Sequence, residues 1–292
     1  MGSRAPGVGG RTVNASAVLE ARPKEHLPFE IRGRGPVVLL LHGFTGSRQS
    51  WDDDLLDGLV RVGRSVVAVD LPGHGSAPAP ETPGAMKDAV AAVVGVLDAT
   101  GARDADLLGY SMGGRIALAT AILHPARVRR LVVEGASPGL SDASERSARR
   151  QADEALAEAI VRDGIEAFVE RWLAQPLFAS QAALPEEVRQ RERRRRLAAD
   201  PGGLAAALCA FGVGHQPSLW ERLGEVRADV LAVAGERDAK FRGIGEAMVR
   251  LLPRARLAIA PEAGHAVHLE APNWFRGVVE EFLREDRMEE KT

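Results

Sequence analysis

The stretch Ala105-Asp106-Leu107-Leu108-Gly109-Tyr110-Ser111-Met112-Gly113 is the part of the sequence that decides the fold. Residues 105–108 have the composition of the end of a buried strand, and residues 114–123 have the pattern of an amphipathic helix. A serine between two glycines, on a sharp turn from strand to helix, is presented beside the free N–H groups of the helix's first turn. Ser111 is therefore the first candidate for a chemically active side chain.

Strands and helices alternate on both sides of this turn. Short apolar runs predict buried parallel strands, and segments of helical periodicity separate them. The predicted strands are residues 29–31, 37–41, 66–69, 106–108, 128–133, 230–234 and 257–259, and the predicted helices are 50–60, 86–100, 114–123 and 274–284. The alternation predicts a mostly parallel central sheet with helices on both faces. Together with the strand–turn–helix around Ser111, it is typical of the α/β-hydrolase fold.

The alternation stops between residues 138 and 225. No buried strand is predicted in this segment, which is charged and helix-forming and has six arginines between Arg189 and Arg196. Because the strand pattern then resumes, we expect a helical cap at 138–225, inserted between two parts of one hydrolase core at 27–137 and 226–285. The arginine run, taken as a whole, predicts a solvated helix face.

The two ends of the chain differ from this core. Residues 1–26 are rich in glycine and arginine and lack periodicity, which predicts a disordered extension with at most one edge strand, near Ala17–Arg22. Residues 286–292 are charged and predict a solvated tail.

The composition limits the classes of function. The chain has 292 residues, 45% hydrophobic residues and a net charge of −2, so nothing suggests a nucleic-acid or membrane partner. One cysteine, Cys209, excludes an internal disulfide and fits a reducing compartment. No apolar run has transmembrane length, and residues 1–24 lack the apolar segment of a secretory signal. We therefore expect a cytoplasmic protein.

A serine hydroxyl becomes reactive only when a base takes its proton and a third group orients that base. In this fold the order along the chain is serine, acid, histidine. Asp238 follows one predicted strand and His265 follows the last, so both would lie at the edge of the sheet where Ser111 lies. Glu236 or Asp229 could replace the acid, and His268 could replace the base.

An oxyanion site needs two backbone N–H groups. Met112, directly after the serine, would supply one, and Phe44, in the loop after the strand at 37–41, would supply the other. His42 and His74 lie in glycine-containing loops, where a structural role in hydrogen bonding is favoured over a role as a second base.

Arg115 is an unusual residue for its position in the sequence. It follows Ser111 by four residues, in the first turn of the helix, where a cation opposes the helix dipole. An anionic partner would offset this cost. That partner is either a buried carboxylate of the protein or an acidic substrate.

Several motifs beyond the serine turn together resemble one family, the 2-succinyl-6-hydroxy-2,4-cyclohexadiene-1-carboxylate synthases of menaquinone biosynthesis. The resemblance runs from about Pro36 to Phe282 and includes the cap. It rests on Tyr110 and Arg115, Ser137-Pro138-Gly139-Leu140, Trp172, Gln175-Pro176-Leu177-Phe178-Ala179-Ser180, Gly214-His215-Gln216-Pro217-Ser218-Leu219-Trp220, Gly235-Glu236-Arg237-Asp238-Ala239-Lys240-Phe241 and Gly264-His265-Ala266-Val267-His268-Leu269-Glu270.

The resemblance implies a lyase that eliminates pyruvate from 2-succinyl-5-enolpyruvyl-6-hydroxy-3-cyclohexene-1-carboxylate, with no metal or organic cofactor. It maps the family's triad to Ser111, Asp238 and His265. Its substrate-binding positions map to Tyr110, Arg115, Arg149, Trp172, Arg196 and Lys240, although the arginine run allows more than one register for Arg196. The substrate is a tricarboxylate, which arginine and lysine can pair with directly. The alternative is a carboxylesterase or thioesterase that uses the same triad through an acyl-enzyme.

Overall fold

The structure is a computed structural model that describes residues 26–81 and 86–284. The predictions for residues 1–25, with the edge strand near 17–22, and for the tail at 286–292 lie outside these residues. The described strands are β1 (Phe29–Gly33), β2 (Val37–Leu41), β3 (Ser65–Val69), β4 (Ala105–Tyr110), β5 (Val128–Glu134), β6 (Asp229–Gly235) and β7 (Ala255–Ala260). The helices of the core are α1 (Asp53–Arg61), α2 (Met86–Ala99), α3 (Met112–Leu123), α7 (Ala239–Leu251), α8 (Val267–Glu270) and α9 (Pro272–Arg284).

These strands form one sheet in the order β1-β3-β2-β4-β5-β6-β7. All neighbours pair in parallel except β1, which is antiparallel to β3. The central strands are in register, with Leu39 opposite Leu107 and Leu107 opposite Leu131. The prediction of a mostly parallel sheet is confirmed, and the carboxyl ends of its strands lie at one edge, where α/β folds place their sites.

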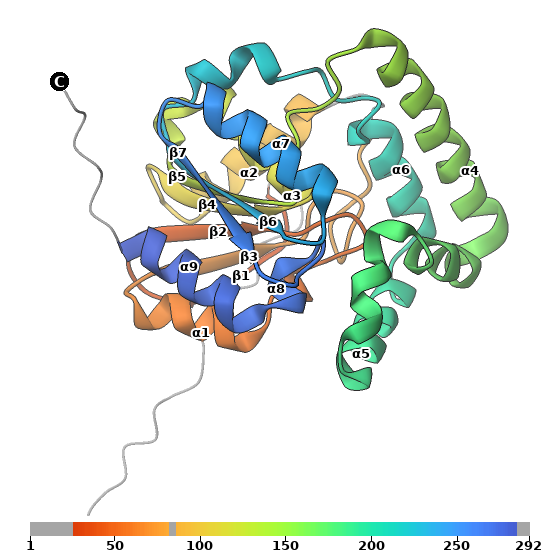
Figure 1. The fold of residues 1–292 in the computed structure, drawn as a ribbon, viewed down its shortest axis with the longest axis horizontal. Helices are drawn as coiled ribbons and strands as arrows, with labels where there is room; N and C mark the ends of the chain where they lie inside the picture. Colours follow the sequence, from red (N-terminus) through yellow and green to blue (C-terminus); the bar gives the residue numbers. More distant parts are fainter. Residues whose placement is uncertain (1–25, 82–85, 285–292) are drawn as a thin grey trace, which may run out of the picture.

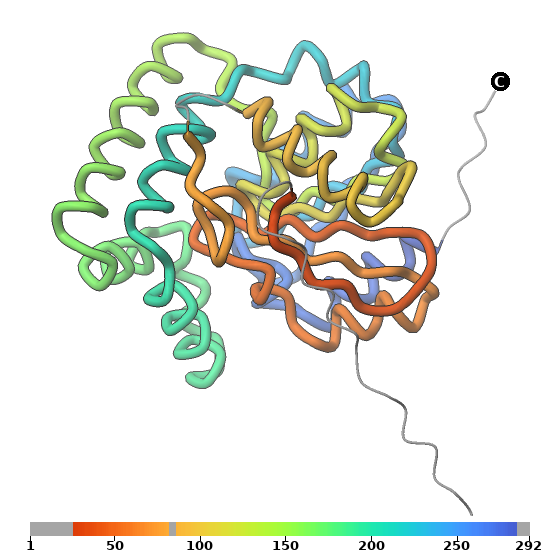
Figure 2. Tube along the Cα trace, turned by 180° about the vertical axis from the view of Figure 1, so that it is seen from behind, coloured from red at the N-terminus to blue at the C-terminus, as the bar shows by residue number. Residues whose placement is uncertain are grey.

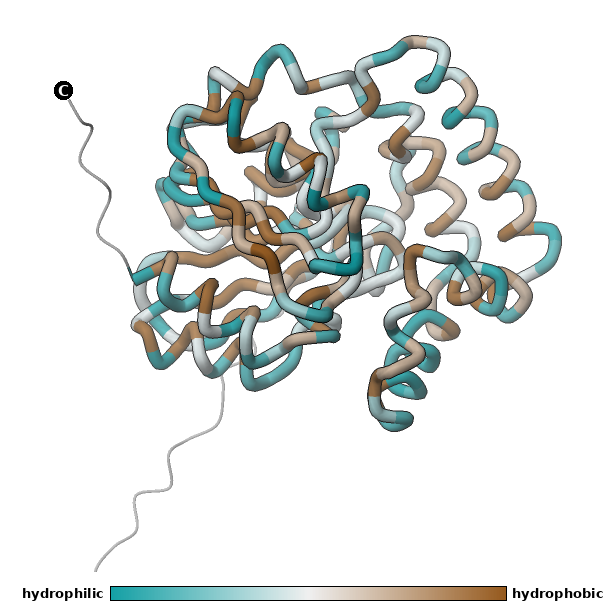
Figure 3. Tube along the Cα trace, in the orientation of Figure 1, coloured by the Kyte–Doolittle hydropathy of each residue, from teal (hydrophilic) through white to brown (hydrophobic). Residues whose placement is uncertain are grey.

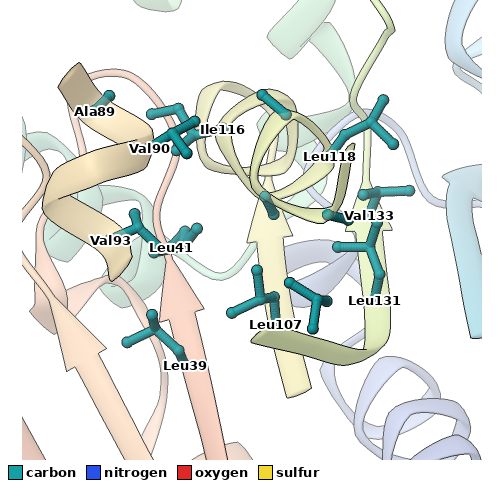
Figure 4. Packing of buried hydrophobic residues seen from close by; sticks show 14 of the residues in the cluster. Leu39, Leu41, Ala89, Val90, Val93, Leu107, Ile116, Leu118, Leu131 and Val133 are labelled. Carbon is teal, nitrogen blue, oxygen red and sulfur yellow. The ribbon is translucent and has the colours of Figure 1, made fainter. Parts of the chain in front are cut away.

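Helices cover both faces of the sheet (Figure 1). On one face α2 and α3 pack on the central strands, and Figure 4 shows Val90 of α2 beside Ile116 of α3, and Val93 beside Leu41. On the other face α1 and α9 form the second part of the core. Each fully buried valine, leucine or isoleucine side chain stabilises the fold by about 1.5–3 kcal/mol relative to the same side chain exposed to solvent. Figure 3 shows the hydrophobic residues concentrated on the strands.

The predicted elements are present with small shifts of their ends. The predicted helix at 50–60 is a short 3-10 turn, Arg48–Ser50, followed by α1. Trp51 lies between the two. Asp52 is the N-cap of α1, because its side chain accepts a hydrogen bond from Leu55 N. The helix after the serine begins at Met112, two residues before its predicted start.

Between β5 and β6 the chain leaves the sheet and forms α4 (Ala143–Leu173), α5 (Glu186–Leu197) and α6 (Pro201–Phe211), the cap. These helices lie together on one side of the core (Figures 1 and 2). Gly164, with φ 82° and ψ 171°, breaks α4 into two helical segments. The prediction that the whole arginine run is solvated is wrong for Arg196, which is buried. Helical periodicity turns Arg196 inward and leaves Arg195 half-buried, while Arg191, Arg193 and Arg194 face solvent.

Candidate active site

The turn from β4 to α3 holds Ser111 in a strained conformation. Its φ of 50° lies in the left-handed region that non-glycine residues rarely adopt, and its N–H donates to the carbonyl oxygen of Glu134 (2.8 Å). Gly113 makes the turn possible, because a Cβ there would collide with the backbone carbonyl of Leu41. Strain of this kind is typical of functional sites, and here it places Ser111 at the carboxyl edge of the sheet.

Ser111, His265 and Asp238 form one chain of hydrogen-bonding groups. His265 Nδ1 lies 2.8 Å from Asp238 Oδ2, and His265 Nε2 lies 3.3 Å from Ser111 Oγ. Since a carboxylate only accepts, the proton of neutral His265 belongs on Nδ1, which leaves Nε2 free to accept from the serine. Asp238 is itself fixed, because its Oδ1 accepts a hydrogen bond from Phe241 N at 3.2 Å.

The competing residues have other partners. Glu236 is exposed and accepts a hydrogen bond from Glu262 N (2.9 Å). Asp229 pairs with Arg254 at 2.6 Å. His268 pairs with the buried carboxylate of Glu134, with Nδ1 2.9 Å from Oε1. The geometry therefore favours Asp238 and His265 over the alternatives that the sequence left open.

The serine opens into a cavity of about 450 Å³ between the cap and the core. Of the candidate site residues, all but Asp238 line it; Asp238 lies behind His265. The lining candidates are Phe44, Tyr110, Ser111, Met112, Arg115, Arg149, Trp172, Arg196, Lys240 and His265. Residues that are far apart in the sequence thus surround one space, in which Phe44 and Met112 flank the serine as candidate oxyanion residues.

Two histidines beside the cavity have structural roles. His42 donates from Nδ1 to Gly43 O (2.8 Å) and accepts at Nε2 from Leu71 N (3.0 Å), which uses both ring nitrogens. Burial lowers the pKa of His42 to about 4 and that of His74 to about 3. Both are neutral at pH 7. His42 ties the loop after β2 to the loop after β3, and His74 holds its own loop through a contact of Nδ1 with Pro72 O at 3.0 Å.

Arg115 is buried, and its two hydrogen-bond partners are both uncharged. Its Nη1 donates to Phe211 O (2.9 Å) and to Gln216 Oε1 (2.7 Å). No carboxylate within the described ranges lies at salt-bridge distance from it. Burial, and then the nearby charge of Arg149, lower the Arg115 pKa to about 10, while Asp153 raises it. Among the described residues, Arg115 therefore has no carboxylate at salt-bridge distance. Of the two anionic partners that the sequence allows, this leaves an acidic substrate.

The cap supplies three of the candidate binding residues. Arg149 pairs with Asp153 at 2.7 Å, and Arg196 Nη1 lies 3.4 Å from Glu192 Oε2. Trp172 Nε1 and Arg196 Nε are buried and have no partner among the residues that the structure describes. A buried N–H group without an acceptor is costly, so these two donors are suited to an acceptor on a bound molecule.

Sequence reasoning missed three supporting residues. Gln216 orients Arg115 from 101 positions away in the chain, so no local pattern could reveal it. Glu134 directly follows the strand predicted at 128–133 and had no predicted role, although its position at the strand's carboxyl end is a signal. Glu270 appeared only as the last letter of a motif. In the described part of the chain, no group of three or more His, Cys, Asp or Glu residues is arranged to hold a metal, and no helix there is long and apolar enough to span a membrane.

Comparison with known proteins gives consistent matches. Residues 36–272 match the alpha/beta hydrolase fold family. A Bacillus subtilis (strain 168) protein with the provisional name 2-succinyl-6-hydroxy-2,4-cyclohexadiene-1-carboxylate synthase is 41% identical over 87% of this chain and 94% of its own length. The Escherichia coli (strain SMS-3-5 / SECEC) synthase of that name is 33% identical over 81% of this chain and 89% of its own length. The structure of MenH from S. aureus superposes with a TM-score of 0.82 at 31% identity, and the match covers 88% of this chain and 97% of the MenH chain.

Proposed function

Because this chain belongs to the α/β-hydrolase fold family and, within it, to the 2-succinyl-6-hydroxy-2,4-cyclohexadiene-1-carboxylate synthases, we propose that it acts in menaquinone biosynthesis as a carbon–oxygen lyase. Its substrate would be 2-succinyl-5-enolpyruvyl-6-hydroxy-3-cyclohexene-1-carboxylate. The products would be pyruvate and 2-succinyl-6-hydroxy-2,4-cyclohexadiene-1-carboxylate.

The observation that carries this proposal is the charge of the cavity. Arg115, Arg149, Arg196 and Lys240 line it, and none of the described residues that line it is acidic. A buried guanidinium with only neutral partners is costly until an anion arrives. A substrate with three carboxylates would supply that charge, whereas a simple neutral ester would leave Arg115 uncompensated.

The proposed chemistry begins with proton transfer. Ser111, whose own proton passes to His265 Nε2, would remove the proton from the ring carbon next to the succinyl carbonyl. Asp238 would hold the tautomer and stabilise the imidazolium. The N–H groups of Phe44 and Met112 would stabilise the enolate oxygen. As the enolate collapses, the bond from the ring to the enolpyruvyl oxygen breaks, and the departing enolate takes up a proton and becomes pyruvate.

The test is direct. The purified protein is supplied with the enolpyruvyl substrate, and pyruvate is measured with a coupled NADH assay. We expect stoichiometric pyruvate and a conjugated diene product. Ser111→Ala should abolish turnover, while the matched variant Ser144→Ala, at an exposed serine of α4, should retain it. Failure of the wild-type protein to release pyruvate would refute the proposal.

A second measurement separates this lyase from the esterase or thioesterase alternative. An esterase leaves an acyl group on the serine, whereas proton abstraction leaves no covalent intermediate. Intact-protein mass spectrometry of samples quenched during turnover should therefore show only the unmodified mass. A kinetically competent adduct that is absent from Ser111→Ala would favour the nucleophilic mechanism.

A further inference from the structure

One carboxylate binds the backbone on both sides of His265. Glu270 Oε2 accepts a hydrogen bond from Gly264 N (2.7 Å), and Glu270 Oε1 accepts one from Ala266 N (3.1 Å). The two N–H groups belong to the residues immediately before and after His265. Both oxygens of Glu270 are therefore used to fix the loop that carries the imidazole.

The position of Glu270 is itself set by the fold. It is the last residue of α8, and its N–H donates to Ala266 O at 2.9 Å. The same short helix is fastened to the end of β5 by His268, whose backbone N and Nδ1 both contact the carboxylate of Glu134, at 3.0 and 2.9 Å. The sheet thus holds α8, and α8 holds the loop of His265.

Little freedom is left for the His265 ring. A Cβ on Gly135 would lie 2.8 Å from its Cε1, and the Phe241 ring lies 4.6 Å from it, centroid to centroid. Its Nε2 is already 3.3 Å from Ser111 Oγ, at the long end of a hydrogen bond. A small shift of the loop would therefore separate the two atoms that exchange a proton.

We propose that Glu270 is a positioning residue that holds His265 where the imidazole reaches both Asp238 and Ser111. The inference rests on the proposed function only for the role of the Ser111–His265 pair. Glu270 is not among the residues that line the substrate cavity. Its loss should therefore slow proton transfer and leave substrate affinity unchanged, because misalignment of reacting groups lowers kcat.

The discriminating variant is Glu270→Gln. Glutamine keeps the size of the side chain and one carbonyl acceptor but turns an NH₂ group toward one of the two N–H donors. Glu270→Asp keeps the charge with a shorter reach. The matched control is Glu262→Gln, which removes the same charge from an exposed side chain in the same loop. Thermal unfolding of each variant shows that it is folded.

The first readout is phosphonylation of Ser111 by a small neutral fluorophosphonate, followed by intact-protein mass spectrometry. This reaction needs an activated serine but no contact with the arginines of the cavity. We expect Glu270→Gln to react on the order of 10-fold more slowly than the wild type. Glu270→Asp should have an intermediate rate, Glu262→Gln the wild-type rate, and Ser111→Ala no label. In steady-state assays, kcat of Glu270→Gln should fall by a similar factor with KM within about twofold.

Other outcomes overturn the inference in distinguishable ways. If Glu270→Gln is labelled and turns over at the wild-type rates, the hydrogen bonds of Glu270 do not position His265. A raised KM with unchanged kcat would assign Glu270 to substrate binding instead. If the wild-type protein is labelled at Ser111 yet releases no pyruvate, the proposed function fails while the role of Glu270 stands. If wild-type Ser111 is not labelled, the Ser111–His265 pair and the inference fail together.

Discussion

Gln216 Oε1 accepts a hydrogen bond from Arg115 Nη1 at 2.7 Å, so a neutral amide from the cap orients the one buried cation in the first turn of α3. The contact fixes the direction of the guanidinium and leaves its charge unneutralised. A bound carboxylate can then pair with a donor that is already oriented, which limits the entropy lost on binding.

Replacement of Arg115 should therefore weaken substrate binding. We expect Arg115→Gln to raise KM by about 10- to 150-fold, since a charge-assisted hydrogen bond contributes roughly 1.5–3 kcal/mol. Arg115→Lys, which keeps the charge, should have a smaller effect. Steady-state kinetics measure both, and an unchanged fluorophosphonate reaction at Ser111 serves as the control for an intact site. An unchanged KM in Arg115→Gln would show that no substrate anion binds there.

Replacement of the proposed triad acid should affect the chemical step more than binding. We expect Asp238→Asn to fold normally and to lose on the order of 10²–10⁴-fold in kcat, because an amide no longer holds the Nδ1–H tautomer of His265. Glu236→Gln is the matched control, since Glu236 is exposed and points to the neighbouring loop. If Glu236→Gln shows the loss and Asp238→Asn does not, the acid has been misassigned.

Arg149 should contribute less than Arg115. Its side chain is 43% exposed and already forms an ion pair with Asp153. Solvent screening and this ion pair both reduce the binding free energy that a substrate carboxylate can obtain from Arg149. We expect Arg149→Ala to raise KM by about 3- to 10-fold and to make KM less sensitive to ionic strength. Arg150→Ala, at the neighbouring exposed position, provides the comparison. Identical salt dependence in the two variants would exclude Arg149 from the binding site.

The buried pair of His268 and Glu134 should make stability depend on pH. Burial lowers the pKa of His268, but the charge and hydrogen bond of Glu134, with Glu192 and Asp52 adding smaller effects, raise it above its ordinary value. A raised pKa in the folded state contributes stability that is complete below about pH 6.5 and is lost as pH rises through the folded value.

We therefore expect His268→Gln to lower the free energy of unfolding by about 3 kcal/mol near pH 6, as for other broken buried ion pairs. The difference from the wild type should shrink toward pH 10. Urea unfolding across this range measures it, with His124→Gln, at an exposed histidine, as the control. A difference that is constant with pH would mean that His268 is neutral in the folded protein.

The sequence predicts the sheet well because its strands are short, continuous apolar runs such as Val37–Leu41, which have few alternative structures. The helix starts are less predictable: α3 begins directly at Met112 because the strained turn is completed within Ser111 itself. The partner of Arg115 and the inward turn of Arg196 depend on packing between the cap and the core. No pattern within a single segment records such contacts.

The cap is attached to the core through two neighbouring strands. β5 and β6 pair directly, with Val132 opposite Leu231, although the whole cap lies between them in the sequence. Because the two strands are parallel, the chain leaves β5 at the carboxyl edge of the sheet and enters β6 at the opposite, amino edge, so the segment between them also returns along the length of the sheet. This one continuous segment brings Arg149, Trp172 and Arg196 to the cavity, whereas Arg115 and Lys240 reach it from helices of the core. The charge of the cavity therefore depends on how the cap segment is seated on the core.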